Sequence, residues 1–134
     1  MRRRSGLRLA LAGIGAVAAT FGTLGVVQGS RGVLNGGTVS PNVDSELRFF
    51  ASWYAVLGFL LLRTVRRPEP ETTIVRACAA GFLVAACGRA LSIRALGPPS
   101  AVFKVLMAIE FAIPALILPW HEAVRRQLVR GATS

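Results

Sequence analysis

The sequence predicts an all-α membrane protein, a bundle of four transmembrane helices with both chain termini in the cytoplasm. Hydrophobic residues make up 53% of its 134 residues and charged residues only 16%, whereas soluble domains carry about 25% charged residues. A chain of this length cannot bury that much apolar surface in one soluble core. A membrane-spanning helix needs about 20 mainly apolar residues, and runs of this kind fill most of the chain.

Four apolar runs define the helices that we expect. They cover residues 7–29, 45–62, 73–93 and 100–119. Together they form a single membrane domain over residues 1–134. We expect Asp44 or Ser45 to cap the second helix, since short polar side chains accept hydrogen bonds from the first helical turn. Residues 120–134 are expected to form a short basic cytoplasmic tail.

The basic residues indicate how the helices are oriented. Of 16 basic residues, 15 are arginines, and they cluster beside the apolar runs. This placement favours membrane flanks over a nucleic-acid surface, so we expect no nucleic-acid partner. If four helices cross, 11 basic residues share the side of the two chain ends and five lie opposite. Both termini are therefore predicted to be cytoplasmic, with anionic lipid head groups near the basic flanks.

A second interpretation of the first apolar run is a cleaved secretory signal. Arg3 and Arg4 precede the run, and Ala16-Val17-Ala18 is similar to a cleavage site. The run nevertheless continues to Val27 without a break, which favours a retained helix. The small residues of this run, such as Gly22 and Gly25, permit close packing of helices, which we expect within the monomer.

Charged residues inside the apolar runs are the most informative feature for function. Each costs about 2.5–3.5 kcal/mol at the centre of a bilayer, so such residues face the bundle and find partners. We expect Arg89 to pair with Glu110 or Glu46, because a guanidinium binds a carboxylate through two parallel hydrogen bonds. With Arg48 and Trp53, these residues predict a polar pocket in the outer half of the membrane. The other interpretation is a structural ion pair that fixes helix register.

Glu110 has a second feature, because Pro114 follows it by four residues. Proline lacks the N–H group that would bond the carbonyl of residue 110. A carboxylate and an unbonded carbonyl then share one position, which suits a proton, a cation or an amine. The alternative is a simple proline kink.

The remaining reactive side chains predict no catalytic or metal site. Cys78 and Cys87 are nine residues apart on one expected helix, about 13 Å along its axis, which is beyond the reach of a disulfide. His121 is the only histidine, so we expect no metal cluster and no cofactor. No nucleophile–base set is visible, and we expect no enzymatic activity.

Two segments resemble a known family. Residues 44–54, Asp-Ser-Glu-Leu-Arg-Phe-Phe-Ala-Ser-Trp-Tyr, resemble the hallmark segment of a bacterial membrane-protein family, domain of unknown function 4345. Residues 88–92, Gly-Arg-Ala-Leu-Ser, followed by Gly-Pro-Pro-Ser at 97–100, are similar to its second hallmark. Glu110 falls where that family tends to carry a glutamate. The likeness covers about residues 33–119 and implies a four-helix protein of the bacterial inner membrane, without an established activity.

These observations favour a small non-enzymatic multi-pass membrane protein. Its polar pocket would bind a small amphipathic ligand or a lipid, or the protein would serve as the accessory subunit of a membrane-protein partner. The alternative is a proton-coupled small-molecule transporter that uses Glu110. Its four passes are similar to small multidrug-resistance exporters, but those carry their key glutamate in the first helix, which has no acidic residue here. The oligomeric state stays open.

Overall fold

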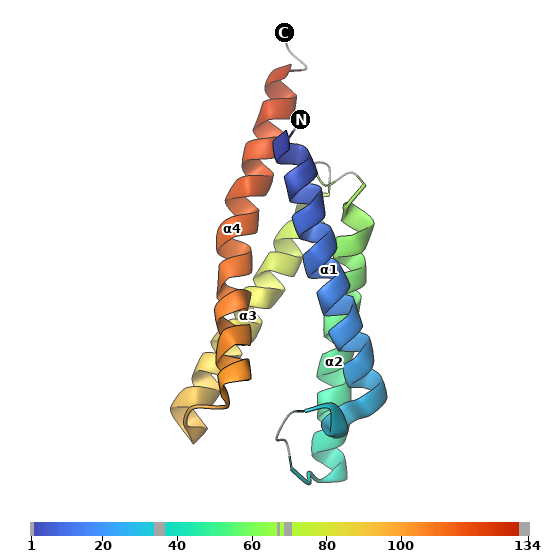
Figure 1. The fold of residues 1–134 in the computed structure, drawn as a ribbon, viewed down its shortest axis with the longest axis vertical. Helices are drawn as coiled ribbons and strands as arrows, with labels where there is room; N and C mark the ends of the chain where they lie inside the picture. The colour runs from blue at the N-terminus through green and yellow to red at the C-terminus, as the bar shows by residue number, and fades with distance from the viewer. Residues whose placement is uncertain (1, 34–36, 67, 69–70, 132–134) are drawn as a thin grey trace. The chain divides into compact units, whose positions relative to one another are not determined.

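The structure is a computed structural model that describes residues 2–33, 37–66, 68 and 71–131. The described chain is helical and contains no strand (Figure 1). Its elements, in order, are α1 (Arg2–Gln28), the short 3₁₀-helix η1 (Gly29–Gly32), α2 (Pro41–Thr64), α3 (Thr72–Leu96) and α4 (Ala101–Gly131). Each of the four α-helices is long and apolar enough to cross a membrane, which confirms the predicted all-α class.

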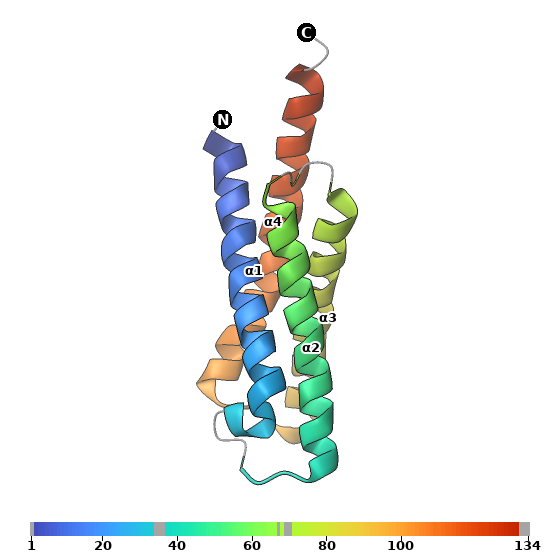
Figure 2. The same cartoon turned by 90° about the vertical axis from the view of Figure 1, so that its right-hand side faces the viewer.

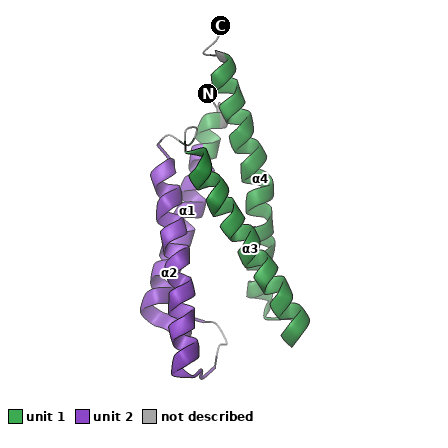
Figure 3. Cartoon of the chain, turned by 180° about the vertical axis from the view of Figure 1, so that it is seen from behind, with its two compact units in different colours: residues 1–7, 67–134 green, residues 8–66 purple. Residues whose placement is uncertain are grey.

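The chain divides into two compact units (Figure 3). Unit 2, residues 8–66, is an antiparallel pair formed by α1 and α2, which lie side by side (Figure 2). Unit 1 combines residues 1–7 with residues 67–134 and contains the antiparallel pair of α3 and α4. Within unit 1, Gly6 in the first turns of α1 lies against the indole ring of Trp120.

Small residues bring α1 and α2 into close contact in unit 2. A Cβ atom added to Gly22 would collide with the backbone of Ala55, and one added to Gly58 would collide with the backbone of Ala19. Gly25 lies against Ala51 in the same way. Since lipid tails are as apolar as the helices, close van der Waals packing of this kind is what holds membrane helices together. The prediction that the small residues of the first helix pack within the chain is confirmed.

The start of α2 differs from the prediction. The helix begins at Pro41, and Ser40 is its N-cap, accepting a hydrogen bond from the backbone N–H of Val43 at 3.4 Å. The prediction that Asp44 or Ser45 caps this helix is therefore wrong. Serine followed by proline is a favoured helix start, but it precedes the apolar run, and hydropathy locates only the apolar part of a helix.

The end of α4 also differs from the prediction, because the helix does not stop at Pro119. It continues through Pro114 and Pro119 to Gly131, so the expected tail is helical over residues 120–131. Residues 132–134 lie outside the described residues. Glu122 forms ion pairs with Arg125 and Arg126, three and four residues later, and pairs at this spacing stabilise helices. The helix therefore continues beyond the predicted apolar run.

Candidate functional site

A partly buried ion pair joins α3 to α4 in unit 1. Arg89 Nε donates a hydrogen bond to Glu110 Oε2 at 2.8 Å, and Arg89 Nη2 donates to Glu110 Oε1 at 3.1 Å. Two parallel hydrogen bonds between a guanidinium and a carboxylate are the strongest geometry that this pair can adopt. The side chain of Glu110 is only 6% exposed. Of the two predicted partners of Arg89, Glu110 and Glu46, the structure shows the pair with Glu110.

The guanidinium of Arg89 also contacts an aromatic ring. Its Cζ atom lies 5.7 Å from the centroid of the Phe103 ring, within the range of a cation–π interaction. The Arg89 side chain nevertheless remains 30% exposed. One partner of the pair is thus buried, while the other is accessible from outside the protein.

Two further cations flank the turn between α3 and α4. Arg94 lies in the last turn of α3, and Lys104 lies in the first turns of α4. Both side chains are exposed. With Arg89 and Glu110, this end of the helix pair carries three positive charges and one negative charge among its described residues, so it attracts anions.

Pro114 lies in α4 one turn after Glu110 and is buried. Because proline has no N–H group, the helix ladder supplies no donor from residue 114 to the Glu110 carbonyl. The carboxylate of the same residue has both oxygens bonded to Arg89. A proton or cation entering here would compete with the guanidinium for those oxygens.

Arg48 has a different set of partners, which lie in unit 2. Its Nε donates to Asp44 Oδ2 at 2.7 Å, and its Nη1 donates to the carbonyls of Val26 and Val27 at 2.7 and 2.9 Å. The last carbonyls of a helix have no partner within the helix. Arg48 therefore caps the carboxyl end of α1 from α2.

Asp44 completes this cap. Its Oδ1 accepts hydrogen bonds from the backbone N–H of Ser30 at 2.7 Å and from the Ser30 hydroxyl at 2.8 Å. Gly29 permits the close approach, since its φ is +57° and a Cβ atom there would collide with Asp44 and Arg48. We call Ser30, Asp44 and Arg48 the α1–α2 clamp. The i,i+4 spacing of Asp44 and Arg48 is the sequence signal that would have indicated it.

Glu46 and Trp53 lie on the exposed surface of α2. Glu46 is exposed, and Trp53 is 56% exposed. The ring of Trp53 packs edge-on against Phe49 at 6.3 Å between centroids. Of the predicted site residues, the structure brings Arg89 and Glu110 together and assigns Arg48 to the α1–α2 clamp. A pocket that also includes Glu46 and Trp53 stays a prediction.

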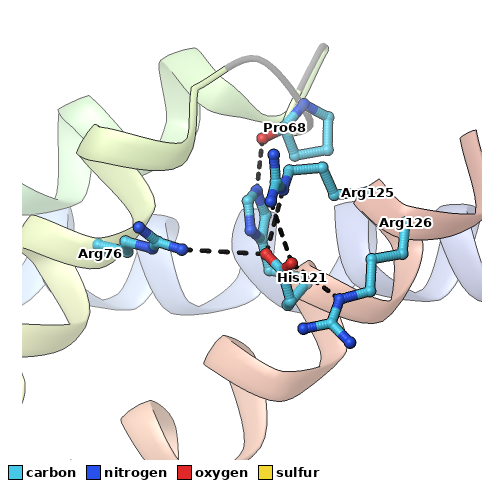
Figure 4. Close-up of polar contacts among 6 residues, drawn as sticks. Pro68, Arg76, His121, Arg125 and Arg126 are labelled. Carbon is cyan, nitrogen blue, oxygen red and sulfur yellow. Dashed lines mark hydrogen bonds and ion pairs between the residues drawn. The ribbon is translucent and has the colours of Figure 1, made fainter. Parts of the chain in front are cut away.

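A second polar cluster lies where α4 passes beyond its apolar run (Figure 4). His121 is 2% exposed, and its Nε2 donates to the carbonyl of Pro68 at 2.7 Å. In the next position, Glu122 binds Arg125 and Arg126 at 3.0 Å and lies 3.9 Å from Arg76. Their positions in the sequence indicate only membrane flanks, so the cluster was not predicted.

Among the described residues, the other reactive groups form no recognisable centre. Cys78 is buried and Cys87 is exposed, and neither takes part in a disulfide. Within the part of the chain that the structure describes, no three His, Cys, Asp or Glu side chains are grouped so as to hold a metal ion.

Four apolar helices and a partly buried charge pair between two of them define a multi-pass helical membrane protein. The chain belongs to the family described as "Domain of unknown function (DUF4345)", whose model matches residues 6–121. The match begins within α1, so the first helix is part of the family domain, which extends further than the residues 33–119 of the expected likeness. No curated protein and no solved structure matches the chain.

Proposed function

We propose that this protein is a non-enzymatic protein of the bacterial cytoplasmic membrane that binds an amphipathic ligand with an acidic head group. The head group would contact Arg89 at the turn between α3 and α4. Its apolar tail would lie along the exposed apolar side chains of the same helices, such as Leu91 and Val102.

The unequal exposure of the Arg89–Glu110 pair is the observation that carries this proposal. The carboxylate side chain is 6% exposed and the guanidinium side chain 30% exposed. Glu110 accepts hydrogen bonds from two nitrogens of the guanidinium. Glu110 and Phe103 hold the guanidinium in place, so an anion that meets it from outside needs little reorganisation of the protein.

The surrounding charge favours an acidic head group over a cationic one. Arg94 and Lys104 are exposed on either side of the turn, so the local excess of positive charge repels an amine or a cationic drug. The apolar surface around the turn favours a molecule with a tail, because burial of apolar area contributes about 25 cal/mol per Å².

Ligand-induced stabilisation of the purified chain in neutral detergent tests this proposal. Decyl phosphate is the probe, and decyl trimethylammonium and decyl maltoside are the cationic and neutral comparisons. A ligand at one hundred times its Kd stabilises the folded state by about 2.7 kcal/mol, which a melting curve resolves. We expect stabilisation by decyl phosphate alone.

Two variants separate ligand binding from a purely structural ion pair. Arg89→Gln should weaken binding of decyl phosphate at least tenfold, since hydrogen bonds to charged groups contribute about 1.5–3 kcal/mol. Glu110→Gln should lower stability but keep the response to the ligand, because Arg89 remains. Arg31→Gln is the matched charge control, as Arg31 is exposed in η1. An equal response in wild type and Arg89→Gln would contradict the proposal.

The transport alternative stays a prediction, and it requires a different role for Glu110. Proton coupling requires that the carboxylate release and bind a proton, which in this geometry means separating it from Arg89. Stabilisation by the cationic probe that disappears in Glu110→Gln would support transport and overturn the ligand proposal.

Orientation is part of the proposal, with both termini in the cytoplasm. The basic residues that follow the positive-inside pattern support it. A chain with Cys78 and Cys87 replaced by serine, carrying one new cysteine at Arg31 or at Arg130, tests it in spheroplasts. An impermeant maleimide should label the cysteine at position 31 and spare the one at position 130.

A further inference from the structure

The cluster around Glu122 gathers arginines from two helices on one carboxylate. Arg125 donates to both Glu122 oxygens at 3.1 and 3.0 Å, and Arg126 Nε donates to Oε1 at 3.0 Å. Arg76, in the second turn of α3, points to the same carboxylate, with its Nη2 3.9 Å from Oε2 (Figure 4). One acidic group thus holds three guanidinium groups close to one another.

The cluster has an excess of accessible positive charge. The side chains of Arg76, Arg125 and Arg126 are 63%, 44% and 69% exposed, and that of Glu122 is 25% exposed. Each guanidinium has five N–H donors, of which Glu122 accepts only part. The cluster therefore presents donors and two uncompensated positive charges to the surroundings.

Its position in α4 places the cluster at the end of a membrane-spanning stretch. It follows Pro119, where the apolar run stops, and the buried hydrogen bond of His121 to Pro68 anchors the preceding residue. An open groove with a volume of about 550 Å³ adjoins the cluster. It is lined by Pro119, Glu122, Ala123, Arg126, Gln127 and Arg130. Its lining combines the charged side chains of Arg126 and Arg130 with the apolar Pro119 and Ala123.

We propose that Arg76, Arg125 and Arg126, held in position by Glu122, bind the phosphate of an anionic phospholipid. Arginine binds phosphate through two parallel hydrogen bonds, and a preformed arginine cluster loses less side-chain freedom on binding than separate arginines do. The occupant is a lipid because the cluster lies beside the apolar surface of α4, along which acyl chains extend. This site is separate from the one at Arg89, so either proposal can fail without the other.

Native mass spectrometry of the full chain in neutral detergent tests the site. The probes are phosphatidic acid, phosphatidylcholine and inorganic phosphate. We expect phosphatidic acid to bind more tightly than either comparison. Equal binding of inorganic phosphate would assign the site to a free anion and overturn the lipid proposal, and equal binding of phosphatidylcholine would show that the cluster does not select the head group.

Variants then distinguish a defined site from general attraction to basic residues. Arg126→Gln should weaken phosphatidic acid binding roughly fivefold, because one arginine near the surface contributes about 1 kcal/mol. Arg31→Gln removes the same charge from η1, outside both proposed sites, and should leave binding unchanged. An equal effect of the two substitutions would overturn the proposal.

The Glu122→Gln substitution best distinguishes general electrostatic attraction from a cluster that Glu122 positions. General electrostatics predicts tighter binding, since the substitution removes a negative charge. A cluster that Glu122 holds in position predicts weaker binding, because the guanidinium groups separate. Tighter binding would refute the role of Glu122. The variant Arg125→Lys with Arg126→Lys keeps the charge and the exposed surface but loses the paired donors, and it should also bind more weakly.

Discussion

Gly22 of α1 lies directly against the backbone of Ala55 in α2, leaving no room for a side chain. At this position the α1–α2 pair therefore depends on residue size. Among the described glycines of the same helix, Gly13 has open space where its Cβ atom would be. The two positions form a natural comparison.

Gly22→Ala should destabilise the protein, whereas Gly13→Ala should not. Overpacking costs about 1–3 kcal/mol, because the helices must separate to admit a methyl group. At Gly13 the same methyl group gains helix propensity of up to about 1 kcal/mol. Thermal unfolding in one detergent measures both, and a loss of stability in Gly13→Ala equal to that in Gly22→Ala would contradict the packing argument.

Arg89→Ala should destabilise the α3–α4 pair by about 3 kcal/mol. Removing one partner of a buried pair leaves the other charge uncompensated, which costs about 3–5 kcal/mol, and the partial exposure of Arg89 places the effect at the lower end. Replacing both residues, with Arg89→Met and Glu110→Met, should recover most of the loss. A double-mutant cycle on unfolding free energies measures the coupling, and strictly additive losses would argue against a direct pair.

Gly29→Ala should cost more stability than Gly37→Ala. Both glycines have positive φ, +57° and +64°, so both substitutions carry the strain of a left-handed conformation, about 1–2 kcal/mol. Only at Gly29 would the methyl group also displace Asp44 and Arg48. The difference between the two melting temperatures isolates the α1–α2 clamp, and identical losses would mean that the clamp adds nothing to stability.

Cys87 should react with N-ethylmaleimide well before Cys78. Cys87 is exposed, whereas Cys78 is 1% exposed, and a buried thiol reacts only after local opening of the structure. Labelling of the folded chain in detergent, followed by peptide mass spectrometry, gives the order. The Cys87→Ser variant serves as the control and should label slowly. Equal rates at the two cysteines would contradict the packing of α3.

The central parts of the helices were predictable, because the hydrocarbon thickness of a membrane sets the length of an apolar run. The helix ends were not. Ser40 caps α2 in front of the apolar run, and the pairs of Glu122 extend α4 past it. Both ends depend on local polar contacts that carry no hydropathy signal.

The part of the candidate site in which two opposite charges lie in apolar helices was predictable. Arg89 and Glu110 lie in apolar stretches, and burial requires that each finds a partner. The partners that the structure shows for Arg48 were not predicted, because two of the three are the carbonyls of Val26 and Val27. Every residue has a carbonyl, so residue types give no indication of such a contact.

The continuation of α4 to Gly131 determines how the carboxyl end of the protein can be used. A helix of 31 residues is about 46 Å long, whereas the hydrocarbon layer is about 30 Å thick. A fluorescent protein fused directly after Gly131 would be held in a fixed orientation relative to α4. The transition dipole of its fluorophore would then report the tilt of α4 in polarised light. The same fusion through a glycine-serine linker would tumble freely. The difference in fluorescence polarisation between the two fusions therefore measures the motion of this helix.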